Sequence, residues 1–139
     1  MLTAIPLTII PLILFNAIGF WQGGDPWGAD LFSIPMVSGA AWSVTIFDLV
    51  LLLALVLLFF ETLRSASPAR GATVTNHIVS TVVLLVYVVE FIAVPVAANS
   101  LFFALTAIAL FDVVAGFTIS IRTAQRDFSI GHGGIDSPL

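Results

Sequence analysis

Three acidic residues, Asp48, Glu90 and Asp112, lie within long apolar stretches of the sequence. An ionisable side chain inside a membrane helix costs about 2.5–3.5 kcal/mol on insertion scales, so such a residue marks function or a partner by default. A carboxylate at such a depth can carry a proton or a cation. A protonated carboxyl can instead hydrogen-bond one helix to the next, which contributes about 0.6–2 kcal/mol. No Arg, Lys or His occurs at the depth of these acids, which excludes an ion pair within the chain.

Helical spacing relates these acids to their neighbours. At 1.5 Å per residue, Asp48, Glu90 and Asp112 lie about 8, 10 and 16 Å from the same membrane face. Asp112 belongs to a stripe with a period of four, whose small members let helices approach closely. The stripe consists of Ala104, Ile108, Asp112, Gly116 and Ser120. Only three residues separate the stretches that carry Glu90 and Asp112, so we expect both carboxyls to face one shared interface.

The candidates for a proton or cation site, or for contact with a partner, are Asp48, Tyr87, Glu90 and Asp112. Glu61 differs because it ends its stretch three residues before Arg64, with which it can pair on the helix surface. We interpret His77, at the start of its stretch, as an interfacial side chain that reaches toward water. The sequence contains no metal-ligand pair and no GxSxG, HExxH or P-loop motif. We therefore expect neither a metal site nor an enzyme, and the sequence indicates no particular cofactor.

The elements that must position these residues follow from composition. Of 139 residues, 60% are hydrophobic and 9% are charged, with a mean hydropathy of +1.17, whereas a soluble domain is about 45–50% apolar and about 25% charged. Crossing a bilayer takes about 20 apolar residues, and four stretches qualify: residues 2–20, 43–63, 77–97 and 101–121. We predict an all-α integral membrane protein, a four-transmembrane-helix bundle over residues 1–122, with connections at 21–42 and 64–76 and a short polar tail at 123–139.

The arginines predict the orientation. Arg64 and Arg70 follow the second stretch, and Arg122 and Arg126 follow the fourth. Short cytoplasmic segments carry the basic excess, so we expect both termini and the 64–76 loop in the cytoplasm and the 21–42 connection on the other side. We expect the inner membrane of a bacterium. Two prolines in the first stretch predict an irregular or kinked start.

The 21–42 connection carries aromatic residues. We interpret Trp21, Trp27 and Trp42 as members of the aromatic belt that anchors helices at the lipid headgroups. Residues 31–37, LFSIPMV, are too few to span a bilayer. They can lie flat in the membrane interface, or contact a lipid, a quinone or another subunit.

The charge balance and the short loops limit the function. Four Arg and no Lys against eight acids leave no basic patch to neutralise phosphates, so we expect no nucleic-acid partner. The expected partners are the lipid bilayer and other membrane subunits or a second copy of the chain. We expect a small accessory or assembly subunit that packs against a larger membrane complex or against itself. The alternative is a proton- or cation-coupled small transporter or channel that uses the intramembrane carboxylates.

Overall fold

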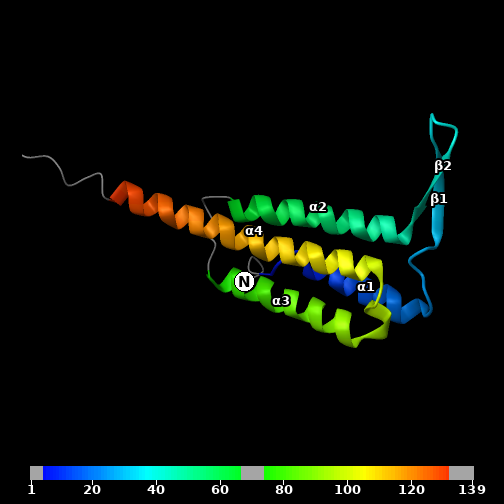
Figure 1. Cartoon of the computed structure of the whole chain (residues 1–139), viewed down its shortest axis with the longest axis horizontal. Helices are drawn as coiled ribbons and strands as arrows, with labels where there is room; N and C mark the ends of the chain where they lie inside the picture. Colours follow the sequence, from blue (N-terminus) through cyan, green and yellow to red (C-terminus); the bar gives the residue numbers. More distant parts are fainter. Residues whose placement is uncertain (1–4, 67–73, 132–139) are drawn as a thin grey trace, which may run out of the picture.

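The computed structural model describes residues 5–66 and 74–131. It is mostly helical, with four helices: α1 (Ile9–Gln22), α2 (Ile46–Ala66), α3 (Val74–Ala93) and α4 (Ser100–Gly131). These helices lie side by side and alternate in direction (Figure 1). Helix α2 and the Ser100–Arg122 part of α4 are long and apolar enough to cross a membrane, whereas the apolar parts of α1 and α3 are shorter. Residues 67–73 of the predicted 64–76 loop and residues 132–139 of the predicted tail lie outside the described residues.

The expectation of an all-helical chain needs a correction, because the 21–42 connection contains strand. Strands β1 (Asp30–Pro35) and β2 (Ala41–Thr45) pair as an antiparallel hairpin. Gly39 has a φ of +85° in its turn, and its N–H donates to the Met36 carbonyl at 2.9 Å. The cause is a local period of two in the sequence, in which Ser33 and Ser43 each stand between apolar residues.

Local chemistry also moves the helix ends from the predicted positions. Residues 43–45 belong to β2, so the second helix begins at Ile46. Helix α3 ends at Ala93 because the next residue, Val94, is extended before Pro95, and Pro95–Ala97 form the 3₁₀ turn η2. The last helix continues to Gly131, into the predicted tail. Helix α1 has 14 residues and begins only at Ile9.

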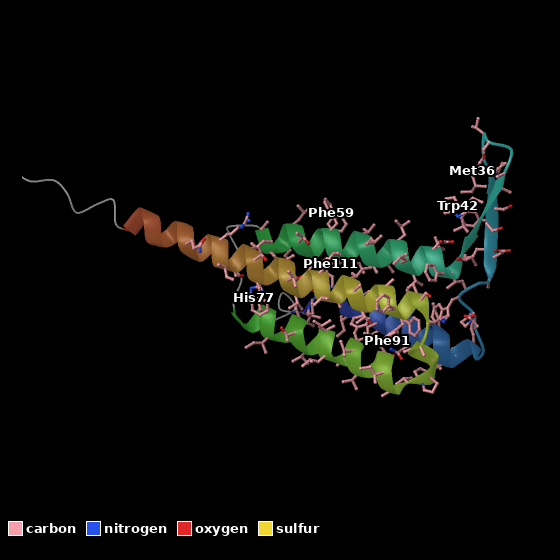
Figure 2. The ribbon with its side chains drawn as sticks, in the orientation of Figure 1. Met36, Trp42, Phe59, His77, Phe91 and Phe111 are labelled. Atoms are coloured by element: carbon pink, nitrogen blue, oxygen red, sulfur yellow. The ribbon has the colours of Figure 1, made fainter. Side chains whose placement is uncertain are left out.

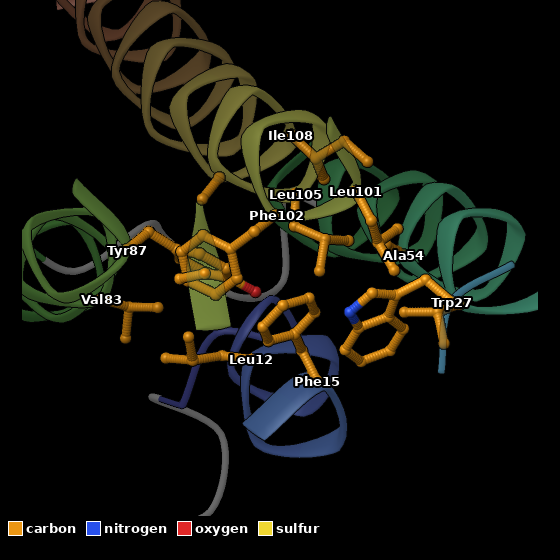
Figure 3. Close-up of a cluster of buried hydrophobic side chains, with 13 residues drawn as sticks. Leu12, Phe15, Trp27, Ala54, Val83, Tyr87, Leu101, Phe102, Leu105 and Ile108 are labelled. Atoms are coloured by element: carbon orange, nitrogen blue, oxygen red, sulfur yellow. The ribbon is translucent and has the colours of Figure 1, made fainter. Parts of the chain in front are cut away.

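The core lies where α4 meets the other helices. Phe15, Tyr87 and Phe102 are fully buried, and Trp27 stacks on Phe15 with ring centroids 4.3 Å apart (Figure 3). Phe102 meets Phe15 edge-on at 4.6 Å. Helix α2 buries only Val50, Ala54 and Glu61.

The outer surface of the helices is apolar. Large hydrophobic side chains are exposed along α2, α3 and α4 (Figure 2), among them Leu52, Phe59, Leu85, Val89 and Phe111. An apolar surface of this extent is rare on monomeric soluble proteins and marks contact with a membrane or with another protein. The helical architecture therefore leaves this surface for lipid or a partner to cover.

Candidate functional site

The backbone just before α1 is held by polar side chains of α2. Residues 5–8 precede the helix. The Pro6 and Leu7 carbonyls accept from the Ile9 and Ile10 N–H groups of α1, whereas an amide group before a helix has no helical carbonyl to bind. The Leu7 N–H donates to Glu61 Oε2 at 3.1 Å, and the Arg64 guanidinium donates both to Glu61 Oε1 and to the Ile5 carbonyl. Glu61 is 5% exposed. The predicted Glu61–Arg64 pair is therefore present. Its glutamate is buried, and the pair also binds the backbone of Ile5 and Leu7.

Thr8 connects the same segment to α3 and α4. Its hydroxyl donates to Asp112 Oδ2 at 3.5 Å, and its carbonyl accepts the Tyr87 hydroxyl at 2.8 Å. Thr8 is 2% exposed and Asp112 is 6% exposed. The Ser80 side chain of α3 also reaches the Asp112 carboxyl, and Glu61 lies near enough to act on its charge. We call Thr8, Glu61, Arg64, Tyr87 and Asp112 the polar clasp, because together they fasten residues 5–8 to three helices.

Glu90 forms no side-chain hydrogen bond with the polar clasp among the described residues, although it lies near enough to Tyr87 to act on it by charge. Its neighbour Phe91 packs against Phe102 and Phe103 in the first turn of α4, whereas Asp112 lies level with Ser80. Ten residues of α3 separate these two levels, which corresponds to about 15 Å along the helix. Glu90 and Asp112 therefore lie at different levels along the bundle, and whether both carboxyls face one shared interface stays a prediction. Glu90 Oε1 is buried and has no hydrogen-bond partner among the described residues.

Asp48 has a local role at the start of α2. Its Oδ2 accepts from the Thr45 N–H and from the Thr45 hydroxyl, both at 2.8 Å, and the Asp48 N–H donates back to Thr45 Oγ1 at 3.3 Å. This reciprocal pattern is a capping box, which satisfies amide groups that the first helical turn leaves unpaired. The four candidate residues are thus divided: Tyr87 and Asp112 meet in the polar clasp, and Asp48 and Glu90 stand elsewhere.

The small-residue stripe of α4 faces α3 at its far end. A Cβ atom on Gly116 would lie 3.0 Å from Cε1 and Nδ1 of His77, and His77 Nε2 hydrogen-bonds Ser120 Oγ. The His77 ring also stacks on Phe117 with centroids 5.1 Å apart. His77 is 8% exposed, so it is a buried contact between helices rather than a side chain that reaches toward water. Ala104, at the other end of the stripe, is half-buried.

The three tryptophans occupy different environments. Trp21 is 90% exposed and Trp42 is 50% exposed, whereas Trp27 is 5% exposed and belongs to the core. Only Trp21 and Trp42 therefore have the exposure that an aromatic belt requires.

Two features of the site were missed from the sequence. Thr8 carries no charge and lies far from its partners along the chain, so the sequence does not indicate that it contacts them. The Thr45-x-x-Asp48 spacing was a readable signal, since it is the spacing of a capping box. Among the described residues, no group of three or more His, Asp or Glu side chains is placed to hold a metal ion.

Comparison with protein-family models, with curated proteins and with solved structures finds no match to the chain.

Proposed function

We propose that the chain is a small multi-pass membrane subunit, with four spans and both termini on the cytoplasmic side, that packs against a larger membrane complex or a second copy. The inner membrane of a bacterium is part of this proposal. Helices α2 and α4 support two of the spans by their length and apolarity. The ends of α2 and α4 that carry Arg64 and Arg122 lie on the same side of the bundle (Figure 1), which agrees with the positive-inside rule.

The polar clasp supports a crossing by the first segment as well. The 14 helical residues of α1 cover about 21 Å, which is short of the about 30 Å of bilayer hydrocarbon. Residues 5–8 would have to extend the crossing in non-helical form. Irregular backbone is tolerated at membrane depth where protein groups satisfy it, and Glu61, Arg64 and Tyr87 do so here.

The observation that carries the subunit role is that the clasp carboxyls are engaged in holding the fold. Glu61 accepts two hydrogen bonds from the chain itself, and Asp112 contacts Thr8 and Ser80. The described helices meanwhile present a broad apolar outer surface. The clasp carboxyls are hydrogen-bonded within the protein, and the outer surface is apolar. This combination favours association with a neighbouring membrane protein over transport of a solute.

The test is isolation of the tagged full chain in a mild detergent after cross-linking in the native membrane. A subunit recovers a partner, or a second copy, at a fixed ratio. Asp112→Asn should leave this recovery unchanged, because an amide keeps the hydrogen-bonding capacity. A chain that stays monomeric and uncross-linked in the native membrane would contradict the proposal.

The alternative function, a proton- or cation-coupled small transporter or channel, is favoured by one residue. A buried carboxylate oxygen without a partner is costly, and Glu90 Oε1 is such an atom. If Glu90 carries a proton or cation, liposomes that contain the purified chain should show a flux that Glu90→Gln abolishes and Asp112→Asn spares. If the liposomes show no flux, the transporter or channel alternative is rejected and the subunit role is retained.

A further inference from the structure

The β1–β2 hairpin has one apolar face and one polar face. Its register places Ile34 opposite Trp42, Phe32 opposite Val44 and Ser33 opposite Ser43. Opposed residues share a face and successive residues alternate. The four apolar residues therefore form one face, which we call the hairpin apolar face, and the two serines lie on the other. Phe32, Ile34 and Trp42 are 53%, 39% and 50% exposed, whereas Val44 is buried within the protein at 4%.

The hairpin apolar face continues the apolar surface of the helices. The hairpin leaves the end of the bundle and runs across the direction of the helices, extending past α2 (Figure 1). Trp42 lies on the side of the hairpin that faces back along the helices (Figure 2). An open apolar groove of about 270 Å³ lies where the hairpin leaves the helices, and Leu31 of β1, Leu14 of α1 and Leu49 of α2 contribute to its lining.

The hairpin backbone limits how deep this face can go. The outer edges of a two-stranded sheet keep N–H and C=O groups that no strand pairs. Hydrocarbon does not tolerate such groups, but the headgroup boundary does, and aromatic side chains prefer that boundary. A hairpin that turns Phe32, Ile34 and Trp42 toward the acyl chains and its two serines toward water suits the headgroup boundary.

We propose that the hairpin lies flat on the bilayer surface beside α2, with Phe32, Ile34 and Trp42 of the hairpin apolar face inserted at the boundary between lipid headgroups and acyl chains. Its ligand is the lipid of that leaflet. This inference rests on the membrane-spanning arrangement proposed above. It adds a lateral contact with lipid that fixes the tilt and rotation of the bundle, since interfacial anchors set these angles.

The experiment uses single spin labels, because the chain contains no cysteine. Ile34→Cys and Ser33→Cys form a matched pair on opposite faces, and Leu52→Cys, at an α2 residue that is 58% exposed, reports on the membrane span itself. Each labelled full chain is reconstituted in liposomes of phosphatidylcholine and phosphatidylglycerol. Collisions with oxygen, which concentrates in lipid, and with a water-soluble nickel chelate are then measured. We expect oxygen to dominate at 34 and nickel at 33.

The outcomes separate the hairpin from the spans. A lipid-exposed label at 52 with water-exposed labels at both 33 and 34 would overturn the inference and leave the spans intact. Labels at 34 shielded from both reagents would indicate a protein partner and would also overturn it. A label at 52 that collides with the nickel chelate would refute the membrane span on which the inference rests.

A label-free measurement covers the case in which a cysteine variant fails to fold. In a Trp21→Phe background, brominated lipids should quench Trp42 strongly and the buried Trp27 weakly. Trp42→Phe should then remove most of the quenching. Quenching that persists unchanged in this variant would overturn the inference.

Discussion

Gly116→Leu tests the closest approach between α3 and α4. A Cβ at position 116 would lie 3.0 Å from two atoms of the His77 ring, so a leucine forces the ring or the helix to move. Overpacking costs about 1–3 kcal/mol, and loss of the His77–Ser120 hydrogen bond costs about 0.6–1.7 kcal/mol. Replacing a glycine within a helix raises the free energy of unfolding by up to about 1 kcal/mol. We expect the free energy of unfolding to fall by about 1–4 kcal/mol.

The assay is unfolding of the reconstituted chain in bicelles, followed by tryptophan fluorescence. Val114→Leu on the same helix is the matched control, because Val114 is 52% exposed and an added methylene there meets no core atom. His77→Ala should partly rescue Gly116→Leu, since it removes the ring that the leucine strikes. Equal stability of Gly116→Leu and the wild type, or strict additivity in the double variant, would refute the reasoning.

Three further predictions concern the polar contacts. Tyr87→Phe removes the donor to the Thr8 carbonyl and should lower the free energy of unfolding by about 1 kcal/mol, and unchanged bicelle unfolding would count against this bond. Glu61→Leu should destabilise more than Glu61→Gln in the same assay, because the amide oxygen still accepts a backbone hydrogen bond. Thr45→Val breaks the capping box with Asp48 and should speed hydrogen exchange in the first turn of α2 but not in its middle. Uniform exchange rates would contradict it.

Element types were largely predictable because they depend on local pattern. Apolar runs of about 20 residues identified the helical stretches, and Pro95 carried the information for the end of α3. The hairpin was readable too, since residues 32–34 and 42–44 alternate apolar and serine. Residues 31–37 are too few to span a bilayer, which indicates a segment that can lie flat in the interface or contact a lipid, a quinone or another subunit. That interpretation does not include the pairing with residues 41–45.

The contacts of the candidate site could not be derived in the same way. Helix α2 is apolar on nearly every side, so its sequence does not show which face packs inward, and the burial of Glu61 was unexpected. Thr8 meets Asp112 across 104 residues and Tyr87 across 79. Such pairings depend on how each helix is rotated about its axis. Depths counted from assumed helix ends place Glu90 and Asp112 about 6 Å apart along the membrane normal, whereas Asp112 lies near Ser80, ten residues before Glu90 on α3.

The polar clasp changes what the acids in the apolar stretches imply. By residue type alone, Asp48, Glu90 and Asp112 are equivalent, because each places a carboxyl group in an apolar stretch at a cost in free energy. In the structure, Asp48 caps a helix, and Asp112 accepts from the hydroxyl of Thr8 in the segment that precedes α1. Their cost is offset by the amide and hydroxyl groups that they satisfy. Glu90 keeps an uncompensated buried oxygen, so the energetic argument for a proton, a cation or a partner's donor now applies to this one carboxyl.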